Sequence, residues 1–221
     1  MPRYYPIHLN IEGKTCLVVG GGAVAERKVG ALREAGAHVR LVSPRLTPAL
    51  QALADAGEIE AVLAPYTPSC LEGACLVFAV TDDRQVNAQV AADAEARSLP
   101  VNVADSPEES RFLVPSVVRR GEFCLSVSTG GNQPMLAARV CRELEARFGP
   151  EYGDFVELLG QMRAYIKEKT PDPARRRQAL SRLLDAEAPL RALLRAGQRE
   201  TAQERAQALV AAALAAPPAE T

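Results

Sequence analysis

The chain has 221 residues, of which 48% are hydrophobic and 24% are charged, and its formal net charge at pH 7 is −1. This composition is typical of globular proteins, and the length is sufficient for one large core or two modest domains. The near-neutral charge argues against a nucleic-acid binder, and no apolar run approaches the roughly 18 residues that a membrane span requires. The N-terminal segment lacks the apolar core of a signal peptide, so we expect a cytoplasmic protein.

Strand and helix patterns alternate along the first half of the chain. Apolar runs predict strands at 16–19, 38–42, 59–63, 75–80 and 100–104, and the segments between them predict helices at 23–35, 46–56 and 84–97. Strands that are apolar throughout and alternate with helices indicate a parallel sheet covered on both faces. Because crossover connections are right-handed, the pattern predicts a Rossmann-like domain over residues 1–113.

The pattern changes after residue 113. Apolar stretches at 112–118 and 123–128 flank the turn Arg119-Arg120-Gly121-Glu122, which predicts an antiparallel pair of strands. Helices are then predicted at 134–148, 152–169, 172–186 and 200–215. We therefore expect an α/β protein in which the Rossmann-like domain is followed by a small α+β region, 114–149, and a helical C-terminal domain, 150–221.

A glycine-rich turn joins the first strand to the first helix. Gly20 and Gly22, with Ala25 in the third position, fit the fingerprint of a dinucleotide site. Gly20 permits a sharp turn, Gly22 lets the backbone approach a pyrophosphate, and Ala25 lets the helix pack closely on the sheet. The helix N-terminus adds unpaired N–H groups and a partial positive charge. Glycines also form ordinary tight turns, but the flanking strand and helix favour a nucleotide site.

Ligands of open α/β sheets bind beyond the carboxyl ends of the strands. Three segments should therefore converge on the glycine turn, namely 43–45 (Ser-Pro-Arg), 81–83 (Thr-Asp-Asp) and 105–107 (Asp-Ser-Pro). The acidic residue that usually binds the ribose of NAD is absent after the second strand, where Ser43 and Arg45 stand instead. Arg45 either favours a 2′-phosphate, and hence NADP, or faces solvent.

Asp105 is the candidate for catalysis. It follows the strand whose end should lie where substrate and nicotinamide meet, and a carboxylate there can accept a proton as hydride leaves. Asp-Ser-Pro is also good turn chemistry, and the residues alone favour a cap or an Asx-turn.

A second glycine loop, Thr129-Gly130-Gly131-Asn132-Gln133-Pro134, opens the helix predicted at 134–148. It could offer amides and hydroxyls to substrate carboxylates. The residues alone favour a strand-to-helix turn in which Ser128, Thr129 or Asn132 caps the helix. Arginines of this half, Arg111 among them, either clamp a polyanionic substrate or form solvated surface.

The five cysteines are scattered and mostly lie in apolar runs, which indicates buried thiols in a reducing compartment. The one close pair, Cys70 and Cys75, lacks the spacing of a zinc site. No structural metal is expected.

Five blocks of the sequence together resemble the precorrin-2 dehydrogenase family, whose members are stand-alone enzymes or the N-terminal modules of sirohaem synthases. The blocks are GGGAVAERK at 20–28, AVTDD at 79–83, VNVADSP at 101–107, FLVPSVVRRG at 112–121 and SVSTGGNQPMLAAR at 126–139. The resemblance covers residues 1–165 and implies NAD-dependent oxidation of precorrin-2, which carries eight carboxylates, to sirohydrochlorin. Some members also insert Fe²⁺, which makes Fe²⁺ a candidate second substrate.

The resemblance also implies residue roles and a homodimer with its dimerisation region at 114–149. Asp105 would be catalytic. The residues expected around NAD, including those from the strand ends, are Gly20, Gly22, Ala23, Val24, Ser43, Pro44, Arg45, Thr81 and Asp82. The residues expected to bind substrate are Arg111, Ser128, Thr129, Gly130 and Asn132. The alternative function is an NAD(H)-sensing regulatory module that binds the nucleotide without turnover.

Overall fold

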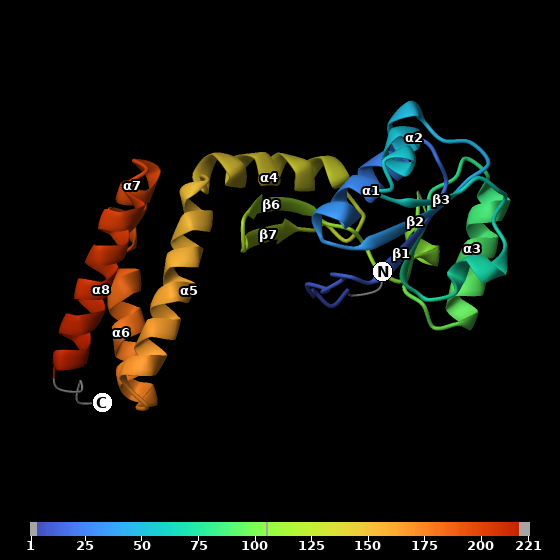
Figure 1. The fold of residues 1–221 in the computed structure, drawn as a ribbon. Coiled ribbons are helices and arrows are strands. Elements are labelled where there is room, and N and C mark those ends of the chain that lie inside the picture. Colours follow the sequence, from blue (N-terminus) through green and yellow to red (C-terminus); the bar gives the residue numbers. More distant parts are fainter. Residues whose placement is uncertain (1–3, 105, 217–221) are drawn as a thin grey trace. The chain divides into compact units, whose positions relative to one another are not determined.

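The computed structural model describes residues 4–104 and 106–216, which form two compact units (Figure 1). The first unit comprises the described residues up to Val114 together with the loop Gly130–Asn132. The second unit comprises Pro115–Thr129 and the described residues from Gln133 onward.

The first unit is built on a five-stranded parallel sheet in the order β3-β2-β1-β4-β5. Its strands are β1 (Thr15–Val19), β2 (His38–Val42), β3 (Glu60–Val62), β4 (Ala74–Ala79) and β5 (Val101–Val103). The connecting helices are α1 (Ala23–Glu34), α2 (Pro48–Asp55) and α3 (Arg84–Ala96), with short 3₁₀ turns at η1 (Pro68–Leu71) and η2 (Pro107–Glu109). This topology confirms the predicted Rossmann-like domain.

Both faces of the sheet are buried. Alternate side chains of each strand point to opposite sides, and helices cover each side. On one face Cys16 and Val18 of β1 join an apolar core with residues of α1 and α2. On the other face Leu17 and Val19 pack with residues of α3 and η1. The strands are therefore apolar throughout, which is the pattern that predicted a parallel sheet.

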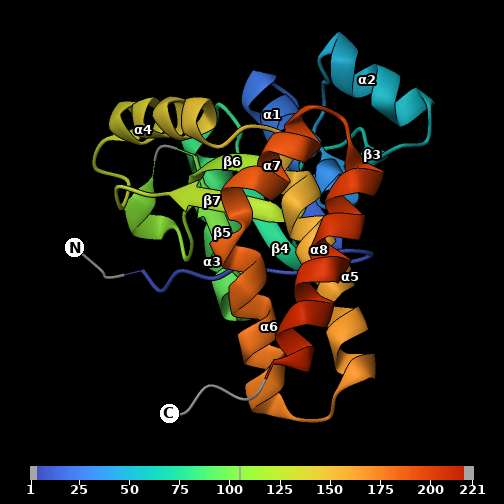
Figure 2. The ribbon, with the colours of Figure 1, turned by 90° about the vertical axis from the view of Figure 1, so that its left-hand side faces the viewer.

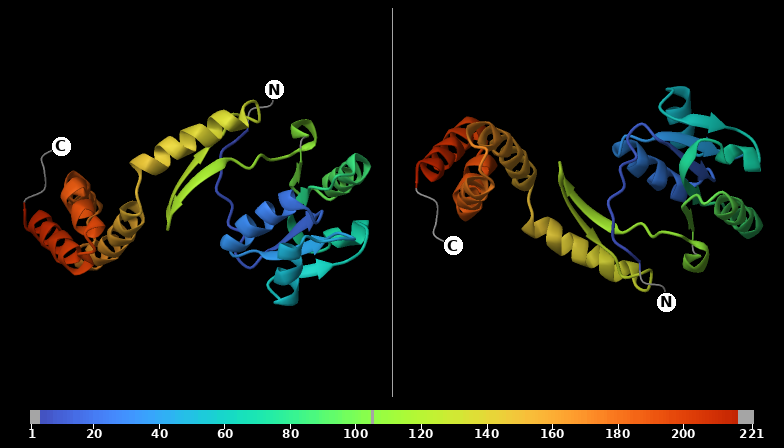
Figure 3. Two further views of the ribbon diagram at one scale, coloured as in Figure 1. Left: turned by 90° about the horizontal axis from the view of Figure 1, so that it is seen from above. Right: turned by 90° about the horizontal axis from the view of Figure 1, so that it is seen from below.

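The second unit begins with a hairpin of β6 (Ser116–Arg120) and β7 (Phe123–Val127), against which α4 (Pro134–Arg147) packs. Figure 3 shows α4, in yellow, running along this hairpin. The first strand of the hairpin was expected at 112–118 but pairs only from Ser116, opposite Val127. Pro115 has no backbone N–H to donate, so it cannot extend the ladder.

Four helices complete the second unit, namely α5 (Glu151–Lys169), α6 (Pro173–Asp185), α7 (Glu187–Arg195) and α8 (Arg199–Ala215) (Figure 2). No separate helix was predicted between 186 and 200, and α7 occupies that segment. Pro189 argues against a helix in this segment when the sequence is read alone. This proline lies in the first turn of α7, where its missing N–H would have no partner within the helix.

The core of these helices is formed by an apolar stripe on each. Phe155, Leu158 and Met162 of α5 recur at intervals of three and four residues and are buried. The buried residues of α8 are small, mainly alanines such as Ala202 and Ala206, which lets this helix approach its neighbours closely. Of the helices in the described part of the chain, none is both long and apolar enough to cross a bilayer.

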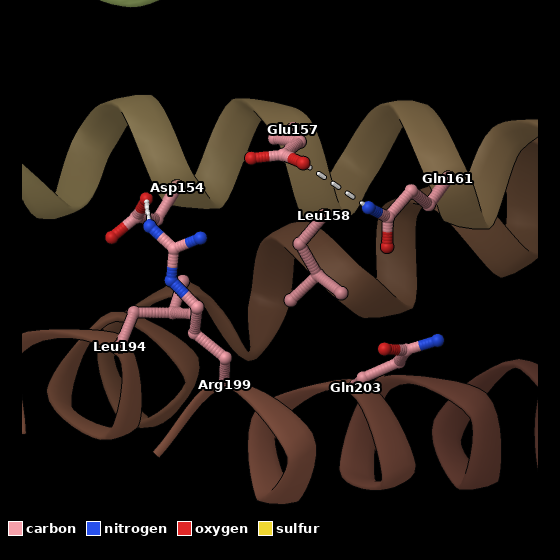
Figure 4. A pocket seen from close by; sticks show the side chains of 7 residues that line it. All are labelled: Asp154, Glu157, Leu158, Gln161, Leu194, Arg199 and Gln203. Atoms are coloured by element: carbon pink, nitrogen blue, oxygen red, sulfur yellow. Dashed lines mark hydrogen bonds and ion pairs between the residues drawn. The ribbon is translucent and has the colours of Figure 1, made fainter. Parts of the chain in front are cut away.

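A polar pocket opens between α5, α7 and α8 (Figure 4). Its lining residues are Asp154, Glu157, Leu158, Gln161, Leu194, Arg199 and Gln203. Arg199 reaches across to form an ion pair with Asp154, and Gln161 Nε2 donates to Glu157 Oε1 at 3.4 Å. The pocket is therefore explained as a contact in which the Arg199–Asp154 pair fastens the start of α8 to α5.

A buried carboxylate fastens α7 to the start of α5. Glu151 is only 5% exposed, and its Oε1 lies 3.4 Å from Arg191 Nη1 and also pairs with Arg195. The Arg191 guanidinium lies 4.0 Å from the centroid of the Tyr152 ring. The hydrogen bond from Arg195, opposed in part by burial, lowers the pKa of Glu151.

Glu151→Gln is expected to lower the free energy of unfolding at pH 7 by about 1–3 kcal/mol, because Arg195 loses its charge partner and Arg191 keeps only Glu187. The pKa of Glu151 is lower in the folded chain, so its stabilisation is present above the ordinary value of 4.5 and is lost as the pH falls towards the folded value. Denaturant unfolding between pH 7 and pH 3 should show the difference between wild type and variant shrinking. Glu157→Gln, at an exposed carboxylate of the same helix, should change stability little. A difference that grows towards acidic pH would contradict this role.

Candidate functional site

The glycine turn after β1 is held between the loops that follow β2 and β4. Gly20 has φ of +127°, and a Cβ on it would lie 2.6 Å from the carbonyl oxygen of Val80. A Cβ on Gly21 would lie 2.0 Å from the carbonyl oxygen of Arg45 and 2.8 Å from Ser43 Oγ. Only glycine fits at either position. Sequence reasoning missed Gly21, although it is the middle one of three consecutive glycines.

Gly22 differs from its neighbours because a Cβ there would meet nothing within 4 Å. It is the N-cap of α1, and its carbonyl accepts from the N–H of Glu26 at 3.1 Å. Ala23 and Val24 form the exposed first turn, whereas Ala25 is fully buried. The first N–H groups of a helix have no partner within the helix. The turn is thus closely packed at Gly20 and Gly21 and open at Gly22, where a pyrophosphate would lie. This arrangement fits a dinucleotide.

The loop after β2 is shaped by Ser43, which is only 8% exposed. Its hydroxyl donates to the carbonyl of Arg45 at 2.7 Å, and Thr47 N donates to the carbonyl of Gly21 at 3.0 Å. Pro44 and Arg45 are exposed, and the Arg45 side chain has no hydrogen bond or ion pair to any described residue. Ser43 therefore fixes the loop, while Arg45 remains available to a 2′-phosphate or to solvent.

The loop after β4 is fixed by a buried residue of α3. Asn87 is 4% exposed, and its Oδ1 lies 3.0 Å from Thr81 N and 2.7 Å from Thr81 Oγ1. Asn87 Nδ2 donates back to the Thr81 carbonyl at 3.0 Å. Asp83 caps α3 by accepting from Gln85 N at 2.8 Å, and Asp82 is exposed. Asn87 was not predicted, although a polar residue on the buried face of a helix could have indicated it.

The predicted catalytic residue, Asp105, lies outside the described residues. The segment after it is bonded to β5 through Ser110, whose Oγ accepts from Val103 N at 2.9 Å and lies 2.9 Å from the carbonyl of Ser106. Both serines are buried. The chain after Asp105 thus returns along β5 in a fixed course, and Asp105 follows the carboxyl end of that strand in sequence.

Arg111 is not brought to the carboxyl ends of the strands. Its N–H donates to the carbonyl of Val101 at 2.8 Å, at the start of β5, and its guanidinium pairs with Glu95 near the end of α3. Both side chains are exposed. These contacts place Arg111 at the amino ends of the strands, whereas the glycine turn lies at their carboxyl ends.

The second glycine loop adjoins the segment that follows Asp105. Gly130 and Gly131 have φ of +65° and +86°, and a Cβ on Gly131 would lie 3.8 Å from Pro107 Cγ and from Leu113 Cδ1. Asn132 lies in the same loop, which is why Gly130–Asn132 belongs to the first unit. Thr129 Oγ1 accepts from Gln133 N at 3.2 Å, and Ser128 is exposed directly after β7. This bond closes the loop before α4, but it does not make Thr129 the cap of the helix, because the N-cap residue is Gln133. Among the residues that the structure describes, no group of three or more His, Cys, Asp or Glu side chains is placed to hold a metal ion.

Two family models match the chain. A model described as "Putative NAD(P)-binding" matches residues 7–116, and a model described as "Sirohaem synthase dimerisation region" matches residues 151–210. A siroheme synthase of Chromobacterium violaceum is 39% identical over 183 residues, which cover 83% of this chain and 39% of that protein. A siroheme synthase of Pseudomonas entomophila is 40% identical over 207 residues, 94% of this chain and 44% of that protein.

This chain belongs to the sirohaem synthase family. The solved structure of SirC, a precorrin-2 dehydrogenase, shares its fold with a TM-score of 0.75 at 23% identity, covering 92% of this chain and 99% of that one. The chain spans less than half the length of the curated siroheme synthases described above. The family model that covers the first unit confirms the predicted NAD-binding character of the Rossmann-like domain. The family's dimerisation model coincides with helices α5–α8 up to Val210 rather than with 114–149.

Proposed function

We propose that this chain catalyses the NAD-dependent dehydrogenation of precorrin-2 to sirohydrochlorin, a step of sirohaem biosynthesis. The observation that carries the proposal is its similarity to siroheme synthases, at 37–40% identity over 78–95% of its length. A glycine turn packed at Gly20 and Gly21 and open at Gly22 supports it independently.

In this proposal one set of residues binds NAD and another residue accepts the proton. NAD, when bound, supplies the hydride acceptor. The amides of Gly22, Ala23 and Val24 at the N-terminus of α1 would hold its pyrophosphate. The loops 43–45 and 81–83 flank that position, and their internal hydrogen bonds keep them preorganised. Asp105 would accept the proton that leaves precorrin-2.

Several finer assignments belong to the same proposal. The proposed cofactor is NAD, although Arg45 also suits the 2′-phosphate of NADP. The active form is proposed to be a cytoplasmic homodimer, with 151–210 as the region whose family model is named for dimerisation. Ser128, Thr129, Gly130 and Asn132 are proposed to bind the substrate, and Fe²⁺ is proposed as a second substrate.

The test is an anaerobic assay of the purified chain with enzymatically generated precorrin-2. Parallel reactions contain NAD or NADP, and absorbance follows sirohydrochlorin and the reduced nicotinamide together. Stoichiometric NADH and sirohydrochlorin are expected, with slower turnover of NADP. Fe²⁺ is added after oxidation is complete, and metal insertion faster than the uncatalysed rate would support the second activity. Nucleotide binding without turnover would overturn the proposal that the chain is an enzyme, and it would favour the NAD(H)-sensing module.

A further inference from the structure

Lys28 of α1 extends towards β4, although its helix packs mainly on β1 and β2. Helix α1 packs on β1 and β2, whereas α3 packs on β4 and β5 from the other face of the sheet. The Lys28 Nζ nevertheless lies 5.4 Å from the ring centroid of Phe78, one residue before the end of β4. On this side Phe78 is also covered by Phe112, whose ring meets it edge-on at 5.4 Å. The ammonium group is thus carried across from α1 to the β4–β5 side of the sheet.

This ammonium group is partly removed from water and has no acidic partner in the described part of the chain. The Lys28 side chain is half-buried, and burial, assisted by the neighbouring charge of Arg27, lowers its pKa. Among the described residues Lys28 Nζ has no hydrogen bond or ion pair, and the ammonium group lies over the Phe78 ring. A cation–π contact compensates only part of the desolvation of an ammonium group. Such a position is suited to an anion that arrives with a ligand.

The place where Lys28 points is adjacent to the strand that leads to Asp105. Phe78 lies opposite Asn102 of β5, and Asn102 Nδ2 donates to the carbonyl of Phe112 at 3.0 Å. Val103, the next residue, ends β5, and Asp105 follows two residues later. Arg27, by contrast, is exposed on α1. Two adjacent cations of one helix therefore occupy different environments.

We propose that Lys28 binds a carboxylate of the tetrapyrrole substrate. The inference rests on the proposed function, since precorrin-2 carries eight carboxylates and any of them that is removed from water needs a cationic or hydrogen-bonding partner. A charge-assisted hydrogen bond from an ammonium group to a carboxylate is stronger than a neutral one, and it strengthens further at a half-buried position. Lys28 would thereby orient the macrocycle beside the end of β5.

The experiment compares Lys28→Met, Lys28→Arg and the matched control Arg27→Met with the wild-type chain. Steady-state assays give kcat and the KM values for precorrin-2 and NAD, and an absorbance titration gives the Kd of sirohydrochlorin, which has the same carboxylates. Lys28→Met is expected to raise the KM for precorrin-2 and the Kd for sirohydrochlorin about tenfold. The KM for NAD should stay within about twofold of wild type. Lys28→Arg should restore most of the loss, and Arg27→Met should resemble wild type.

Separate outcomes test the inference and the function on which it rests. If Lys28→Met leaves the KM for precorrin-2 and the Kd for sirohydrochlorin unchanged, the inference is overturned, and a lower melting temperature alone would assign Lys28 to packing on Phe78. If the wild-type chain binds sirohydrochlorin but does not oxidise precorrin-2, the proposed function fails. The Kd values of the variants would still decide the role of Lys28. If the wild-type chain does not bind sirohydrochlorin at all, both are overturned.

Discussion

Asp105→Asn is expected to reduce kcat/KM for precorrin-2 by about 10²–10⁴-fold, because an amide of nearly the same shape cannot accept the proton that leaves the substrate. The loss should appear mainly in kcat, since the substitution leaves the glycine turn and its packing unchanged. The anaerobic assay measures the rate, and a fluorescence titration with NADH measures nucleotide binding. NADH affinity should remain within about twofold of wild type.

The matched control is Glu108→Gln, which removes an exposed carboxylate three residues further along the same segment. This variant should retain wild-type activity and the same NADH affinity. If Asp105→Asn keeps more than about a tenth of the wild-type activity, the proton acceptor is another group. Equal losses in both variants would indicate that the charge of the segment matters rather than the position of one base.

Gly21→Ala is expected to abolish NAD binding and to destabilise the first unit by about 1–3 kcal/mol or more. The new Cβ would lie 2.0 Å from the Arg45 carbonyl oxygen and 3.0 Å from Leu46 Cδ2, so the loop after β2 must move. That loop is attached to the turn itself, since Thr47 N donates to the Gly21 carbonyl. Denaturant unfolding measures the loss of stability, and a titration with NADH measures binding.

Substitutions of two further glycines, Gly30 and Gly22, distinguish an effect on stability from an effect on NADH binding. Gly30→Ala adds a methyl group to α1 where nothing lies within 4 Å, and it should stabilise the chain by up to about 1 kcal/mol. Gly22→Ala also meets no protein atom, and its φ of −93° is accessible to any residue, so the fold should persist while NADH affinity falls. Unchanged NADH affinity in Gly22→Ala would show that the pyrophosphate lies elsewhere. Wild-type stability in Gly21→Ala would contradict the packing described for the turn.

Local features of this protein are determined by the sequence itself. Apolar strands alternating with helices required a parallel sheet, and the dinucleotide fingerprint required strand β1 to end in a turn at Gly20. Helix caps depend equally on local residues, since Thr47 and Asp83 each accept a hydrogen bond from an N–H two or three residues further along. Such features can be predicted because the groups that interact are neighbours in the chain.

Other features were decided only by the tertiary structure, because they join residues that are distant in sequence. The need for glycine at position 21 arises from the Arg45 carbonyl, in the loop after β2. Arg111 lies at the amino end of β5, away from the glycine turn, because the chain after Asp105 runs back along this strand. Lys28 looks like an ordinary surface residue in the sequence, and only the side on which α1 packs carries its ammonium group to Phe78. The sequence thus determined the strands of the sheet, most of the helices and their local caps, while the packing of one element on another decided which side chains reach the site.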